Sequence, residues 1–197
     1  MKTVVLAASR YSLIFTAVAA LSAQPAQAFT ITMNEVGSNV VANGRGAFNL
    51  TGLTLHSGSF GAPALIRALT GNIFMATGSG LDGYLGFTGP TSFGSGDVFN
   101  PNTFSGDAVG IDPEGFRVIV VPHGYTSGTA LSDSMTFNNA TFASLGLTPG
   151  TYVWTWGDGA NQRFTLRIGA VPDGGSTVSL LGCALFGLAA LRRKLGC

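Results

Sequence analysis

The sequence predicts an all-β chain, an antiparallel β-sandwich whose strand connectivity is left open, with jelly-roll order as one option. Three observations predict it: about ten short segments alternate apolar and polar residues, glycine-rich turns separate them, and no long segment has a helical period. The 29 glycines among 197 residues supply those turns. The body, residues 29–169, has the length of one domain and lies between an N-terminal signal helix and a short C-terminal membrane helix.

The first 28 residues have the three parts of a secretory signal. Two basic residues precede an apolar stretch at 11–21, and small residues stand at Ala26 and Ala28. Signal peptidase accepts small residues at these two positions, so cleavage is predicted between Ala28 and Phe29. The alternative is a retained membrane anchor, for which the apolar stretch is short.

The clearest strand signal in the body is its last pair of segments. Tyr152, Trp154 and Trp156 share one face of a period-two pattern over residues 150–156, and residues 163–168 alternate again. Turn-forming residues at 157–161 lie between the two segments. This order predicts a β-hairpin with a five-residue loop.

Further strands are expected at 29–36, 47–55 and 116–121. The last of these is apolar on both faces, which places it in the middle of a covered sheet. Weaker strand candidates are residues 73–77, 84–87, 98–104 and 132–137. Residues 62–69 fit either a helix or a strand, and residues 141–146 predict a helical turn closed by glycine.

The body is acidic and contains no lysine. Its five arginines stand against eight carboxylates, a formal charge of −3. Phosphate binding needs a basic face, so we expect no nucleic-acid partner. The two cysteines, Cys183 and Cys197, lie beyond the body, so neither a disulfide nor a thiolate metal site is expected within it, and no cofactor is expected.

The tail has three parts in order. Residues 170–177 contain a linker and a short motif with proline and an acid, residues 178–191 are mostly apolar, and a basic cluster follows, formed by Arg192, Arg193 and Lys194. A helix over the apolar part would be about 21 Å long, against roughly 30 Å for a bilayer core. Residues 178–197 should therefore hold the chain in the membrane weakly, with the basic end cytoplasmic and the body outside.

This tail resembles the PEP-CTERM sorting signals that exosortases process, and its motif is most similar to the variant called VPDSG-CTERM. The motif residues are Val171, Pro172, Asp173, Gly174, Gly175, Ser176 and Thr177. Asp173 stands where the parent motif has glutamate, and Gly174 replaces the serine of the named variant. The resemblance implies cleavage near this motif by an exosortase-type membrane protease or transpeptidase, with this chain as substrate. An ordinary tail anchor is the alternative.

Parts of residues 124–157 also resemble a segment that recurs in the ectodomains of proteins with such signals. That resemblance implies no activity. Within it, the row of Tyr152, Trp154 and Trp156 could stack on sugar rings, because aromatic faces suit the apolar faces of sugars. The competing interpretation, which fits an aromatic row at strand spacing better, is that these rings belong to the core.

Asp107, Asp112 and Glu114 lie close together in one loop and are a weak calcium candidate, since calcium prefers oxygen ligands. Solvated turn carboxylates are the alternative and the better fit, because the Asp-x-Asp-x-Asp-Gly order is missing. His56 and His123 stand outside any Gly-x-Ser-x-Gly elbow or metal-ligand spacing. We therefore assign no catalytic residue.

These patterns predict a non-enzymatic exported protein, held in the membrane by its C-terminal helix and then passed to the cell surface or extracellular matrix. The predicted role there is structural or adhesive. One alternative is a carbohydrate-binding module, which depends on the aromatic row and on the link to exopolysaccharide and biofilm that the resemblance implies. A second is a hydrolase with an unrecognised site. Expected partners are signal peptidase, an exosortase-type enzyme, the membrane and extracellular polysaccharide.

Overall fold

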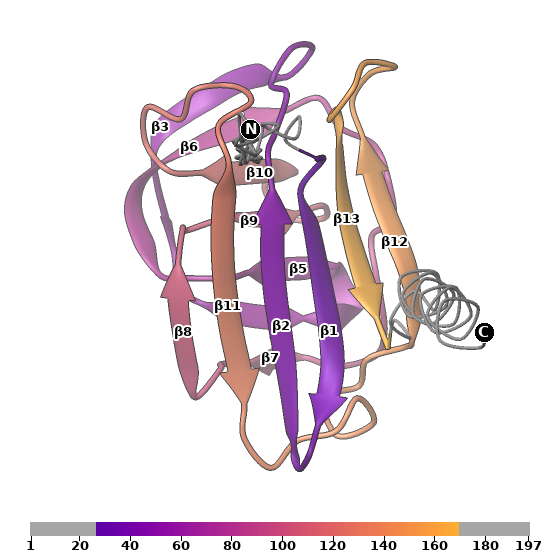
Figure 1. Cartoon of the computed structure of the whole chain (residues 1–197). Coiled ribbons are helices and arrows are strands. Elements are labelled where there is room, and N and C mark those ends of the chain that lie inside the picture. The colour runs from indigo at the N-terminus through magenta and orange to yellow at the C-terminus, as the bar shows by residue number, and fades with distance from the viewer. Residues whose placement is uncertain (1–26, 170–197) are drawn as a thin grey trace, which may run out of the picture.

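A computed structural model describes residues 27–169, which form an all-β body in two sheets (Figure 1). The only helical element among these residues is a single 3-10 turn, η1 (Ala68–Thr70). The prediction of an all-β body is therefore confirmed. The signal segment before residue 27 and the tail from residue 170 lie outside the described residues.

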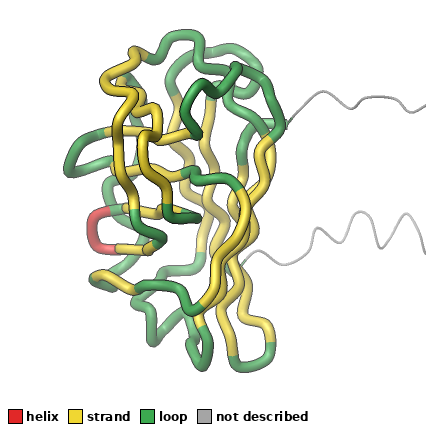
Figure 2. Tube along the Cα trace, turned by 90° about the vertical axis from the view of Figure 1, so that its left-hand side faces the viewer, coloured by secondary structure: helices red, strands yellow, loops and turns green. Residues whose placement is uncertain are grey.

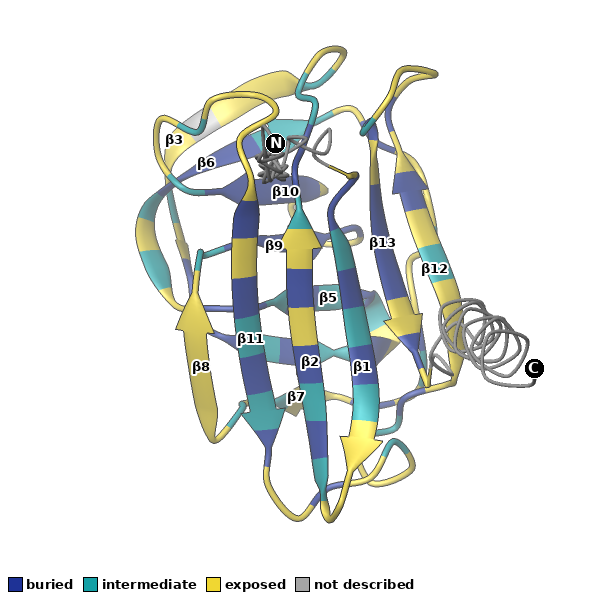
Figure 3. Cartoon of the chain, viewed as in Figure 1, coloured by how far each residue is buried: buried dark blue, intermediate teal, exposed yellow. Residues whose placement is uncertain are grey.

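The first sheet has six strands and faces the viewer in Figure 1. In spatial order they are β12 (Gly150–Thr155), β13 (Arg163–Ile168), β1 (Thr30–Val36), β2 (Asn39–Gly46), β11 (Leu131–Phe137) and β8 (Thr103–Gly106). Buried and exposed residues alternate along most of these strands (Figure 3). Such alternation is typical of a sheet with one face on the core and one in solvent.

The second sheet has seven strands and lies behind the first in Figure 1. In spatial order they are β3 (Thr54–Ala62), β6 (Gly78–Leu85), β10 (Val118–Val121), β9 (Gly110–Asp112), β5 (Asn72–Phe74), β4 (Leu65–Arg67) and β7 (Val98–Phe99). All four residues of β10 are buried, which confirms that this apolar run is a covered inner strand.

One hydrophobic core lies between the two sheets, which form separate layers when seen from the side (Figure 2). Its residues come from both sheets; Ile31 and Met33 of β1 meet the same cluster as Ile73 of β5 and Ile119 of β10. Phe48 contributes from the loop after β2. Its ring stacks on those of Phe29 and Phe164 with centroid separations of 5.0 and 5.9 Å. These ring contacts join the residue before β1, the loop after β2 and the start of β13.

The hairpin of β12 and β13 is present and antiparallel as predicted, and only β12 differs from the expected bounds, because it ends one residue earlier, at Thr155. The expected strand over residues 47–55 is wrong. Asn49 accepts a hydrogen bond from Thr51 N, and Gly52 has a φ of +90°, so the chain turns there and β3 begins only at Thr54. The preceding strand β2 was missed because small residues and glycine weaken its alternation.

The chain at residues 62–69 forms the end of β3, the short strand β4 and the start of η1, so neither a single helix nor a single strand describes it. The predicted turn at 141–146 is present. Leu145 N donates to Thr141 O at 3.1 Å, and Gly146 takes a φ of +61°.

The expectation of purely antiparallel pairing is wrong at one place, because β1 and β13 run parallel. Thr30 lies opposite Thr165, and Met33 lies opposite Ile168. The first and last strands of the body are thus direct neighbours, yet β1 begins and β13 ends at opposite ends of the sheet (Figure 1). The chain enters the sheet at one end and leaves it at the other.

Candidate functional site

The exit of the chain toward its tail is fixed at Gly169. Its N–H donates to the carbonyl of Met33 at 2.9 Å, and its φ is +67°. A Cβ at this position would approach Phe142 and Pro149 to 3.4 Å, so the exit is also closely packed. A folded, hydrogen-bonded residue therefore stands directly before residue 170.

The predicted signal-peptidase bond lies inside the folded body. Phe29 is fully buried, and Ala28 pairs with Ala47 in an isolated parallel bridge. Phe29 N donates to Ala47 O at 3.1 Å, while Ala47 N donates to Gln27 O at 2.8 Å. Proteases cut exposed, extended chain, so cleavage between Ala28 and Phe29 has to come before this end of the sheet forms. Ala26, the other residue of the predicted cleavage site, lies outside the described residues.

The aromatic row of β12 faces the core. Trp154 and Trp156 are 0% and 7% exposed, and Tyr152 is half-buried. Both indole nitrogens donate to backbone carbonyls at 2.7 Å, Trp154 to Pro90 and Trp156 to Asn49. The two indole rings present no open face for a sugar, and the core interpretation of the row fits their placement.

The three loop carboxylates do not converge. Asp107 accepts from Ser132 N at 2.7 Å, beside the end of β8. Asp112 is buried and accepts from the backbone N–H groups of Glu114, Gly115 and Phe116, so it holds the turn before β10. Among residues 27–169 no group of three or more His, Cys, Asp or Glu side chains could hold a metal ion.

The contact between Asp82 and His123 was not predicted from the sequence, because the two residues are 41 positions apart. His123 Nδ1 lies 2.9 Å from one oxygen of Asp82, and Gly124 N donates to the other at 2.8 Å. The hydrogen bond with His123 is the main cause that lowers the pKa of Asp82, against an opposing effect of burial. The pair holds the turn after β10 against β6, and the histidine ring is largely exposed.

Asp133 is the one carboxylate of the described chain whose two oxygens are both buried without a hydrogen-bond partner. It points from β11 toward the core, opposite Gly44 of β2, and only Gly44 leaves room for it, because a Cβ there would meet the Asp133 carboxylate and the ring of Phe29. Burial raises the pKa of Asp133 to about 7, helped by the nearby charge of Asp107 and opposed by the backbone of Gly44.

The outward face of the six-stranded sheet carries polar side chains on neighbouring strands, and two shallow hollows lie over it. One, of about 500 Å³, lies over β12, β13 and the start of β1 and is lined by residues that include Arg163 and Arg167. The other, of about 510 Å³, lies over β1, β2 and β11 and includes Arg45. Together these hollows form a candidate binding surface on this face.

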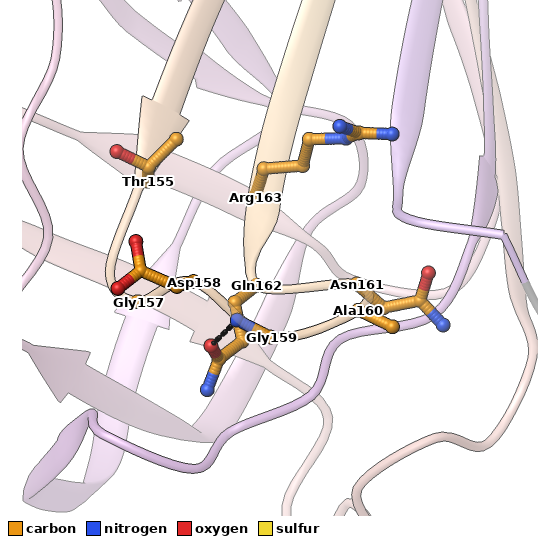
Figure 4. Close-up of a pocket in the computed structure, with 8 residues that line it drawn as sticks. All are labelled: Thr155, Gly157, Asp158, Gly159, Ala160, Asn161, Gln162 and Arg163. Carbon is orange, nitrogen blue, oxygen red and sulfur yellow. Dashed lines mark hydrogen bonds between the residues drawn. The ribbon is translucent and has the colours of Figure 1, made fainter.

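A third hollow, of about 280 Å³, lies in the loop of the β12–β13 hairpin (Figure 4). Gln162 fills its floor: its Oε1 accepts from Gly159 N and its Nε2 donates to Thr51 O, both at 2.6 Å. In Figure 4 the side chain of Asp158 lies on the Thr155 side of the loop, whereas the guanidinium of Arg163 points away from it. Both polar groups of the Gln162 side chain therefore form hydrogen bonds that stabilise the loop.

No helix among residues 27–169 is long and apolar enough to cross a membrane. The segments predicted to contact the membrane lie outside the described residues. They are the signal segment, the apolar stretch over 178–191, and the basic cluster of Arg192, Arg193 and Lys194. The sorting motif from Val171 to Thr177 lies outside them as well.

Comparison with known proteins finds a match in the tail. Residues 170–195 match the family model described as the VPDSG-CTERM motif. No curated protein and no solved structure matches the chain. The match begins at the residue after Gly169, the last residue that the structure describes. The chain therefore carries a VPDSG-CTERM motif at its C-terminal end, as the sequence predicted, and this motif implies an exported protein processed by an exosortase-type system.

Proposed function

We propose that this chain is a non-enzymatic protein of the cell surface or extracellular matrix, whose β-sandwich body has a structural or adhesive role there. The observation that carries the proposal is the VPDSG-CTERM match over residues 170–195, which begins directly after Gly169, the last described residue of the body. In this arrangement the motif is the site of action of another enzyme, and the body is the part that is delivered.

The position of Gly169 supports a defined orientation of the body during processing. The chain leaves the sheet at the end where β13 finishes, and the backbone of Gly169 is tied to Met33. The hairpin loop around Asp158 and the loop after β10 lie at the other end of the six-stranded sheet (Figure 1). While the tail is held in the membrane, those loops would face away from it.

Mass spectrometry of the mature protein from its own cells tests the proposal. We expect a chain that begins at Phe29 and ends within the motif between Pro172 and Gly175. Replacing both Pro172 and Asp173 by alanine should leave the full tail attached in the membrane fraction. Asp158→Ala in the exposed hairpin loop is the matched control, because it also removes a carboxylate but should be processed normally.

Recovery of wild-type chains that end at Cys197, from cells with an active exosortase-type enzyme, would contradict the proposal. Release from the membrane in the alanine variant at the wild-type rate would contradict it too, because processing would then not depend on the motif.

A further inference from the structure

Three of the five arginines of the body share the outward face of the six-stranded sheet. Arg163 and Arg167 are four residues apart on β13, which separates their Cα atoms by about 13 Å. Arg45 of β2 lies opposite Thr30 of β1, which lies opposite Thr165 between the two β13 arginines. Two strand spacings amount to about 10 Å. The three Cα positions thus form a triangle with sides of roughly 12 Å.

These arginines are exposed and are not neutralised within the described chain. None of them has a carboxylate within ion-pair distance among residues 27–169, whereas Arg67 of the other sheet is paired with Asp97 at 2.8 Å. Asp107 is held by Ser132 N at the β8 side, and Asp133, which lines the hollow over β1, β2 and β11, is buried. A body with a net charge of −3 therefore carries a locally positive face.

Between the arginines the face is covered by hydroxyl and amide side chains. The outward positions that line the two hollows include Thr30, Thr32, Asn34, Asn43, Ser132, Thr151 and Thr165. Hydroxyl groups both donate and accept hydrogen bonds, and Arg forms paired hydrogen bonds with carboxylates. The combination matches a ligand that is rich in hydroxyl groups and carries carboxylates at intervals.

The same face fits other anionic partners poorly. Duplex DNA carries one charge per about 1.7 Å, so it would need more cations than three arginines on an acidic body. Binding to an anionic membrane combines basic residues with apolar anchors. Among the described residues, the exposed large apolar side chains on this face are Val36 at the end of β1 and Val153 of β12, at 56% and 37% exposure. They stand on strands that are not neighbours, so they form no continuous apolar anchor.

We propose that the outward face of the six-stranded sheet binds an acidic polysaccharide, with Arg45, Arg163 and Arg167 contacting its carboxylates. The inference deepens the adhesive role proposed above by naming the class of partner, and it rests on display of the body outside the cell. It uses the face opposite to the buried aromatic row, so the polar contacts, and not stacking on Trp154 or Trp156, provide the binding.

Removal of the signal segment strengthens this face. Gln27 and Ala28 line the hollow over β12 and β13, so cleavage after Ala28 would take away part of its rim. The new α-amino group of Phe29 would lie at the place from which Phe29 N now donates to Ala47 O. Its positive charge would add to that of the nearby arginines at neutral pH.

Binding of polygalacturonate, a sugar polymer with one carboxylate per unit, tests the proposal. The full chain in a neutral detergent should be retarded by polygalacturonate in affinity electrophoresis at low salt, should be released at high salt, and should ignore neutral dextran. The double variant R163Q/R167Q should bind about tenfold more weakly, because two exposed charge contacts are lost.

The matched control is R67Q/R117Q, which removes the same charge from the other sheet and should bind as the wild type does. Val153→Glu is a second variant on the proposed face: it keeps all arginines and sets a carboxylate between Arg163 and Arg167, so it should also weaken binding. Thermal unfolding of each variant shows whether it is folded.

Equal weakening in both double variants would overturn the proposal, since net charge and not this face would then matter. Equal binding of dextran, tighter binding of duplex DNA, or no binding at low salt would overturn it as well. All these binding measurements use the purified chain. A negative result in them is therefore distinct from a failure of export or tail processing, which mass spectrometry of the mature protein from cells detects.

Discussion

The two faces of the six-stranded sheet carry opposite chemistry on the same strands. On β13, Phe164, Leu166 and Ile168 are almost fully buried, while Arg163 and Arg167 between and beside them are exposed. The inner face packs against the second sheet, and the outer face meets solvent. The stability of the fold should therefore depend on the inner residues, and ligand binding on the outer ones, although the two sets are neighbours in sequence.

The largest expected effect comes from an inner ring. Trp154→Ala should lower the free energy of unfolding by about 4 kcal/mol, because it removes a fully buried indole and leaves a cavity. Urea unfolding of the full chain measures this change. Val153→Ala, one residue away on the outer face, should cost less than about 1 kcal/mol. Equal effects of the two substitutions would contradict the claim that stability depends mainly on the inner face.

The second effect concerns Asp133, which stands on the inner face as an exception. Its pKa of about 7 in the folded chain lies above the ordinary value of 3.8, so the folded chain binds the proton more tightly than the unfolded chain. Stability from this group is complete below about pH 4 and is lost as the pH rises toward 7, by roughly 3 to 4 kcal/mol. Urea midpoints across this range measure the decline.

Asp133→Asn should flatten that decline, because asparagine does not ionise. A variant that keeps the wild-type dependence on pH would assign the titration to another group. Asp107 is the control for this assignment, because its charge helps to raise the pKa of Asp133. Asp107→Asn should lower that pKa, so the decline in stability should end at a slightly lower pH and be smaller than in the wild type.

A smaller effect is expected at Asp82, a buried carboxylate that does have partners. Asp82→Asn should cost about 1.5 kcal/mol, because the charge-assisted bonds with His123 and Gly124 N are weakened. The lowered pKa of Asp82 gives a stability that is present above its ordinary value of 3.8 and lost as the pH falls through its folded value. Urea unfolding of the wild type and of Asp82→Asn below pH 4 checks this pH dependence, whose direction is opposite to that expected from Asp133.

The smallest effect belongs to the outer arginines. R163Q/R167Q should change the free energy of unfolding by less than about 0.5 kcal/mol, since exposed side chains without ion pairs contribute little to stability. Urea unfolding beside the binding measurement separates the two properties. A loss of stability comparable to that of Trp154→Ala would show that the outer face supports the fold after all.

Strong alternation made several elements predictable. Residues 29–36 and 163–168 alternate cleanly and became β1 and β13 nearly as predicted, and the weaker candidate at 132–137 became β11. The apolar run before Pro122 became the buried strand β10. β2 was missed because Ala42 and Gly44 give its inner face little hydrophobic signal. Gly44 is small for a reason that lies in another strand, since Asp133 occupies the space beside it.

The candidate surface was not predictable in the same way. Arg163 and Arg167 alternate with apolar residues of β13, so the sequence indicates that they are exposed, whereas Arg45 stands between two glycines. The three arginines share one surface only because β1 lies between β13 and β2. The parallel pairing of β1 with β13 joins the first and last strands of the body, a contact that no local pattern encodes. The Asp82–His123 pair is hidden from the sequence for the same reason.

The sequence by itself determined the destination of this protein: the order of motif, apolar stretch and basic cluster in the tail is contiguous, and contiguous signals can be read without a fold. It also determined the all-β class, because side chains alternate along a strand with a period of two. Only the tertiary structure decided which residues share a surface, which carboxylate lost its partners, and where the chain leaves the body. Those properties depend on strand pairing across long separations, and pairing is set by how two whole sheets bury one core.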